Sequence, residues 1–231
     1  MGAALPRMLS VNAGYVDTAG FLALKGLFTS HVTGNFVTLG AALVSGTSGV
    51  FAKLLALPVF CAVVLLARLL AFRLRAHSRP VLHTMLILQL ALLILGAVLA
   101  VLLGPFPDGD GSAALATGMT LVAAMAIQNA AHRVHLSGAP PSTIMTGTTT
   151  QIMLDLGDVI HGLSPEVAAA TKHRLLQMSV SVAAFAGGCA LGALLYAGVN
   201  VWCFCLAPVL SLAAVMLSAS RRGGAPAPAA R

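Results

Sequence analysis

Apolar residues fill six stretches of this chain that are each long enough to cross a lipid bilayer as a helix. A hydrocarbon layer of about 30 Å needs roughly 20 helical residues. The six stretches cover residues 8–24, 51–72, 81–103, 112–131, 173–197 and 199–218. The pattern therefore predicts an all-α polytopic membrane protein with six transmembrane helices.

Two further stretches, 27–49 and 142–161, are hydrophobic enough to enter a membrane but unusually rich in Thr, Ser and Gly. We call them the first and second broken segments. If both enter the membrane and return to the same side, nearly all the basic residues face one side. That side would carry Arg7, Arg73, Arg75, Arg79, Arg133, Lys172, Arg174, Arg221, Arg222 and Arg231, against Lys25, Lys53, Asp108 and Asp110 on the other. Cytoplasmic loops collect Lys and Arg, so the charges favour six spans, two re-entrant segments and cytoplasmic termini over seven or eight spans.

The composition agrees with a membrane protein and excludes an ordinary soluble one. Hydrophobic residues make up 58% of the 231 residues and charged residues 8%, against roughly a quarter charged in a typical soluble domain. The mean hydropathy is +0.95. The net charge of +7 comes from 13 Lys and Arg residues, which lie mostly at helix ends and in the tail and so report the topology. Because no basic run alternates with aromatic residues, we expect the bilayer as a partner and no nucleic acid.

The two broken segments share a motif, which suggests an internal repeat. Thr33-Gly34-Asn35 lies in the first and Thr146-Gly147-Thr148 in the second. Each motif follows a helix that carries polar residues, and each precedes two long apolar helices. Since each unit crosses three times, the second copy is expected to be inverted, as in many transporters. The first repeat would cover residues 1–105 and the second 106–222, followed by a disordered tail at 223–231.

Non-helical backbone at membrane depth needs partners from protein or trapped water, so the broken segments are candidates for a site. A helix that begins at Asn35 or Thr148 would point its free amides and positive dipole end at an anion or a carbonyl-bearing solute. The two tips are expected to meet near the midplane. The alternative is that the hydroxyls only cap helices and join neighbouring helices. The predicted substrate-binding set is Thr33, Gly34, Asn35, Gln128, Asn129, Thr146, Gly147 and Thr148.

Asp17 is a carboxylate in the middle of a largely apolar helix, and such residues are costly enough to suggest a function. It could couple transport to protons or bind a cation. Alternatively, it could accept hydrogen bonds from the amides of a broken segment. His31 and Asp155 are further candidates for proton coupling or gating, although a histidine at His31 is also typical of an interfacial hydrogen-bonding group.

The chain carries no catalytic motif and no cluster of metal-ligand spacing, so we expect no enzyme activity, no metal and no cofactor. Gly188 and Gly192 form a GxxxG motif. Such a motif allows two helices to approach closely, either across a homodimer seam or within one chain.

Several motifs resemble the YoaK-type family of bacterial membrane proteins, a domain of unknown function. They are Gly14-Tyr15-Val16-Asp17-Thr18-Ala19-Gly20-Phe21-Leu22, Ser30-His31-Val32-Thr33-Gly34-Asn35, Ile127-Gln128-Asn129-Ala130 and Met145-Thr146-Gly147-Thr148. The resemblance covers nearly the whole chain. It departs at His132-Arg133, where the family often carries an arginine pair. It implies a bacterial inner-membrane protein with no assigned substrate.

Together these features predict a small-solute transporter of the inner membrane with a central site between the broken segments. A proton-coupled carrier is favoured because Asp17 is titratable. The alternatives are a passive channel for a small anion or neutral solute, and a non-transporting scaffold or assembly protein.

Overall fold

The chain folds into helices joined by short turns. The computed structural model describes residues 4–143 and 145–223, in which no residue forms a β-strand. The helices are α1 (Ala4–Ala23), α2 (Asn35–Ser45), α3 (Val50–Ala76), α4 (Val81–Leu103), α5 (Ser112–His135), α6 (Met145–His161), α7 (Pro165–Val199) and α8 (Leu206–Gly223), with the 3-10 turns η1 (Val32–Gly34) and η2 (Asn200–Cys205). The all-α prediction is confirmed. Residues 224–231 of the tail expected to be disordered lie outside the described residues.

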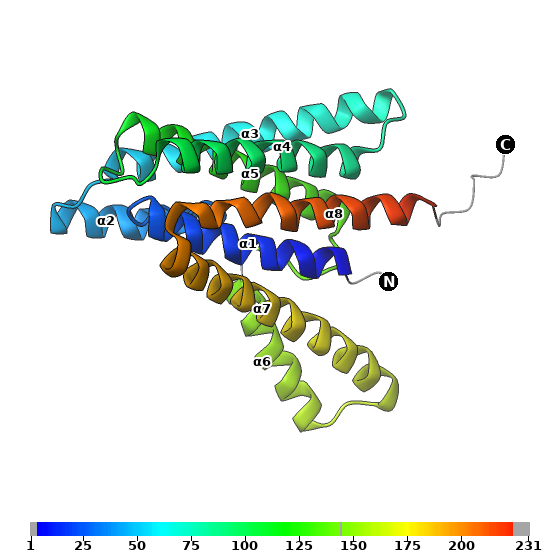
Figure 1. The fold of residues 1–231 in the computed structure, drawn as a ribbon. Helices are drawn as coiled ribbons and strands as arrows, with labels where there is room; N and C mark the ends of the chain where they lie inside the picture. Colours follow the sequence, from blue (N-terminus) through cyan, green and yellow to red (C-terminus); the bar gives the residue numbers. More distant parts are fainter. Residues whose placement is uncertain (1–3, 144, 224–231) are drawn as a thin grey trace.

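Among the residues that the structure describes, four helical segments are long and apolar enough to cross a membrane. They are α3, α4, α5 and the continuous segment Pro165–Ser220, which contains α7, η2 and most of α8. In Figure 1, α7 and α8 run in opposite directions on either side of η2, as the two separate spans predicted there require. The remaining predicted span, residues 8–24 in α1, is not among these segments. Its mean hydropathy is lowered by Arg7, Asn12 and Asp17.

Large apolar side chains face outward on these helices. Leu65 and Leu66 on α3 are 61% and 62% exposed, Leu102 on α4 is 73% exposed and Leu194 on α7 is 71% exposed. Contiguous apolar surface of this extent is unfavourable in water and suited to lipid. The outer surface therefore supports a membrane protein independently of helix length.

Polar α1 is enclosed by other helices. It packs along α7 and also contacts α5 and α8, and it lies in the middle of the bundle in Figure 1. The other close pairs are α3 with α5, α4 with α5, α4 with α8, α2 with α3 and α6 with α7. Enclosure explains how Asn12 and Asp17 are tolerated, because protein groups rather than lipid surround them.

The GxxxG motif of α7 packs within the chain against α1. A Cβ atom on Gly188 would lie 2.1 Å from the carbonyl oxygen of Val11, and one on Gly192 would lie 2.8 Å from that of Tyr15. On the facing helix, a Cβ atom on Gly14 would lie 2.2 Å from the carbonyl oxygen of Phe185. Of the two alternatives for this motif, the structure shows the contact within one chain.

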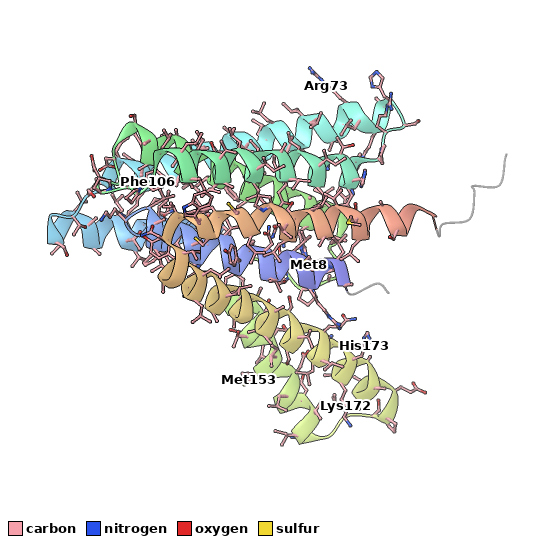
Figure 2. All side chains as sticks on the ribbon, viewed as in Figure 1. Met8, Arg73, Phe106, Met153, Lys172 and His173 are labelled. Atoms are coloured by element: carbon pink, nitrogen blue, oxygen red, sulfur yellow. The ribbon has the colours of Figure 1, made fainter. Side chains whose placement is uncertain are left out.

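The charged residues separate between the two ends of the bundle. Figure 2 shows Arg73 and Phe106 at opposite ends. At the Phe106 end, Lys53 Nζ donates hydrogen bonds to the carbonyl oxygens of Lys25 at 2.7 Å and Gly49 at 3.2 Å. Asp110 accepts the backbone N–H groups of residues 49, 50 and 52 at 2.9 to 3.0 Å. The few charges at this end are therefore used to hold helix termini together.

The contact between α1 and α7 predicts that Gly188→Ala destabilises the protein. The added methyl group would collide with backbone, which cannot move away cheaply, so the free energy of unfolding should fall by about 1–3 kcal/mol. Gly187→Ala is the matched control, because a Cβ atom on Gly187 meets nothing within 4 Å. Thermal denaturation in detergent micelles should show a lower melting temperature for Gly188→Ala only. Equal melting temperatures for the two variants would contradict the packing.

Candidate functional site

The first broken segment turns back along α1 and is held there by Asp17. After α1 ends, Lys25 and Gly26 adopt left-handed backbone conformations with φ of 55° and 83°. A glycine favours such a turn because it has no Cβ atom. The chain then returns to the level of Asp17, whose Oδ1 accepts the backbone N–H groups of Thr29 at 2.7 Å and Ser30 at 2.8 Å, and the Thr29 hydroxyl at 3.3 Å. Three roles were predicted for Asp17: proton coupling, cation binding and acceptance of hydrogen bonds from a broken segment. These contacts support the third role.

Asn35 closes the same turn. Its Oδ1 accepts the N–H of Phe28 at 2.9 Å, and its Nδ2 donates to the carbonyl oxygen of Phe28 at 2.8 Å. Helix α2 begins at Asn35, as predicted. A Cβ atom on Gly34 would lie 3.0 Å from the Phe28 ring, so the glycine makes room for that ring. His31 also packs on Phe28, with ring centroids 5.7 Å apart.

The second broken segment is held from the equivalent position of α5, but by a hydrogen bond between two side chains. After α5 ends at His135, the chain returns so that the Thr143 hydroxyl donates to Asn129 Oδ1 at 2.6 Å. Asn129 is six residues before the end of α5, and Asp17 is six residues before the end of α1. Helix α6 (Met145–His161) already includes Met145, so the predicted start at Thr148 is wrong. The break is made earlier, by Pro140 and Pro141, because proline cannot continue a helix.

Gln128 joins several helices in the buried centre. Its Oε1 accepts from Asn12 Nδ2 at 3.0 Å and Gln89 Nε2 at 2.7 Å. Its Nε2 donates to the carbonyl oxygen of Leu9 at 2.8 Å and the Ser142 hydroxyl at 3.3 Å. These bonds link α1, α4, α5 and the second broken segment. The sequence interpretation missed Asn12 and Gln89, although a lone amide in an apolar helix is the signal that would have found them.

A cavity of about 730 Å³ lies beside the second broken segment. Of the predicted site residues, Asn129, Gly147 and Thr148 line it, together with Gln151 of α6. Thr146 and Gln128 are not among the lining residues. The cavity is thus built by α3, α5, α6, α7 and the turn between α5 and α6.

The first broken segment lies away from this cavity, so Thr33, Gly34 and Asn35 do not line it. The hydrogen bond from Asn12 to Gln128 places these two residues at the same level of the bundle. Asp17 is five residues further along α1, which corresponds to about 8 Å of helix. The structure therefore gathers the predicted residues into two groups rather than around one point.

Asp155 of α6 does not line the cavity and pairs with Arg174 of α7. Arg174 Nε donates to its Oδ2 and Arg174 Nη2 to its Oδ1, both at 2.7 Å, and Gln151 Nε2 donates to Oδ1 at 2.7 Å. The hydrogen bonds from Arg174 hold the pKa of Asp155 below its ordinary value. This arrangement ties the hairpin of α6 and α7 together. No group of three His, Cys, Asp or Glu side chains among the described residues is placed to hold a metal ion.

The apolar helices and the enclosed polar centre define a helical membrane protein. A family profile described as a protein of unknown function, DUF1275, matches residues 5–217. The chain belongs to this family, which confirms the resemblance carried by the motifs around Asp17, Asn35 and Gln128. No curated protein and no solved structure matches the chain.

The contacts of Asp17 predict that Asp17→Ala destabilises the protein. The variant would leave the N–H groups of Thr29 and Ser30 buried without an acceptor, at a cost of about 1–3 kcal/mol each. Asp17→Asn should keep most of the stability, since its side-chain oxygen can accept the same bonds. Thermal denaturation of both variants in detergent micelles measures the loss of stability. The control is Asp158→Ala, which replaces an exposed carboxylate. An Asp17→Ala variant as stable as the control would contradict the assignment.

Proposed function

We propose that this protein transports a small solute across the bacterial inner membrane and that the solute binds in the cavity beside the second broken segment. The cavity is the observation that carries the proposal. Its wall combines apolar side chains such as Phe60 and Met178 with amide and hydroxyl groups such as Asn129 and Thr143. Ligand sites commonly have this mixture and a volume of about 300–1,000 Å³.

The proposed topology has six crossings, with both broken segments re-entrant from opposite faces. The packing pairs support an inverted repeat, because they are preserved when the halves are exchanged. Helix α1 packs on α7 and α8, and α5 packs on their counterparts α3 and α4. Likewise, α2 packs on α3 and α6 on α7. Two similar halves that meet at such interfaces could rock against each other, which is the usual route to alternating access.

The orientation follows from charge. We place the arginine-rich end, with Arg7, Arg73, Arg75 and Arg79, in the cytoplasm together with both termini. The cavity lies near this end, because the second broken segment leaves α5 there. The proposal includes no catalytic step and no nucleic-acid partner.

Proton coupling through Asp17 has less support than binding. Protonation would disturb a carboxylate oxygen that already accepts three hydrogen bonds. We therefore propose a carrier or channel whose solute site does not depend on titration of Asp17. A folded Asp17→Asn variant that binds solute but has lost flux would instead favour proton coupling.

Blocking the cavity tests the function. We expect that screening small organic anions, amino acids, nucleobases and inorganic ions will find a compound that raises the melting temperature, since a ligand at 100 times its Kd stabilises by about 2.7 kcal/mol. Gly147→Phe should abolish that shift, because Gly147 lines the cavity and has open space around it. Uptake of the same compound into proteoliposomes should also be lost.

Gly157→Phe is the matched control on α6. Gly157 also has open space around it but does not line the cavity, so binding and uptake should persist. A compound that binds Gly147→Phe as tightly as wild type would contradict the assigned site. A protein that no compound stabilises and that takes up none of them would favour the scaffold alternative.

A further inference from the structure

The charge of the cavity wall narrows the class of solute. Arg133 is the one permanently charged side chain in the wall, and no described residue that lines the cavity is acidic. The remaining polar lining groups are His132, amides and hydroxyls. A cation would find no carboxylate here, whereas an anion would find a guanidinium able to donate two hydrogen bonds.

The start of helix α6 also contributes positive potential to the cavity. Gly147 lies in its first turn and lines the cavity. The first turn of an α-helix carries N–H groups without partners inside the helix, and the helix dipole makes that end positive. A negative group in the cavity would be stabilised by this end of the 17-residue helix.

His132 provides an independent observation that points to a ligand. Its side chain is 5% exposed and lines the cavity, and neither ring nitrogen has a hydrogen-bond partner in the described structure. The carbonyl groups of Ala139 and Pro140 lie near the ring, but neither forms a hydrogen bond of ordinary geometry with it. Buried polar atoms are nearly always paired, so a ligand or water is expected to supply the partner.

The rest of the wall is apolar. Phe60 and Val64 from α3 and Met178 from α7 face the same cavity. Such a wall would receive a hydrocarbon or aromatic group and would gain from excluding water. An inorganic anion would leave this surface unused.

We propose that the cavity binds an organic anion, with its carboxylate or phosphate group toward Arg133, His132 and the start of α6 and its apolar body against Phe60, Val64 and Met178. This inference rests on the proposed function and adds the chemical class of the solute. The same chemistry is present in the headgroup region of an anionic lipid, which the experiment below separates from a free solute.

The test compares benzoate with benzamide, which share a ring and differ in the charge of the polar group. Full-length protein in nanodiscs of phosphatidylcholine is titrated with each compound, and the affinity is read from the melting temperature. Benzoate should bind about tenfold or more tightly than benzamide, because hydrogen bonds between two charged groups are stronger than those to a neutral amide. Equal affinities, or no binding of either compound, would overturn the proposal.

Arg133→Gln identifies the partner of the charge. Arg133 is exposed, so the variant should fold, and benzoate should bind about tenfold more weakly while benzamide is unaffected. Arg73→Gln is the control, because it removes an exposed charge on α3 that does not line the cavity. An equal loss of benzoate affinity in both variants would mean a general effect of net charge and would overturn the assignment.

A second set of nanodiscs, with one part phosphatidylglycerol to two parts phosphatidylcholine, separates the two sources of anion. Benzoate affinity should be unchanged. Its loss on adding the anionic lipid would assign the cavity to a headgroup and overturn the proposal of a free solute.

The two proposals can fail separately. If a neutral compound from the screen binds and Gly147→Phe blocks its uptake, transport stands and the anion proposal fails. If benzoate binds as expected but does not enter proteoliposomes that contain the protein, the anion site stands and the transport proposal fails.

Discussion

Backbone that leaves a helix inside a membrane must find hydrogen-bond partners in the protein, and the rest of this structure depends on how that need is met. In the first half this partner is Asp17, six residues before the end of α1. In the second half Asn129, six residues before the end of α5, holds the segment through a side-chain hydroxyl instead. Asp17 accepts the amides of Thr29 and Ser30, and Asn129 accepts the hydroxyl of Thr143. These bonds allow the chain to return beside the helix it has just left. The polar motifs are thus first of all the anchors of two turns.

The anchors require that their helices be shielded from lipid. Glycines at Gly14, Gly188 and Gly192 bring α7 so close to α1 that no methyl group fits between them, while Gln128 ties α1, α4 and α5 together. The two halves nevertheless differ in how tightly their turns are closed. The first turn is closed tightly around Phe28 by Asn35, whereas the second borders a cavity that collects positive and apolar groups.

Much of the fold could be predicted from the sequence because membrane helices need long apolar runs, and the start of α2 followed from its Thr-Gly-Asn motif. The start of α6 could not, since Thr146 and Gly147 are compatible with a first helical turn and the break was made by Pro140 and Pro141. The position of the cavity depends on which faces of α3, α5 and α7 meet, and this is decided by tertiary packing. Asn12 and Gln89 each show as a lone amide in an apolar helix, but a single sequence does not reveal that both bond to Gln128.

The central claim is that the chain crosses the membrane six times and that both broken segments return to the side they entered. Single cysteines at the exposed positions Arg7, Ser45, Pro107 and Ser164, in a background lacking the four native cysteines, can be labelled with an impermeant maleimide in right-side-out and inside-out vesicles. Positions 45 and 107 should react from the periplasmic side only, and positions 7 and 164 from the cytoplasmic side only. If the first broken segment spanned the membrane, positions 7 and 45 would react from the same side, and if the second did, positions 107 and 164 would; either result would contradict the account.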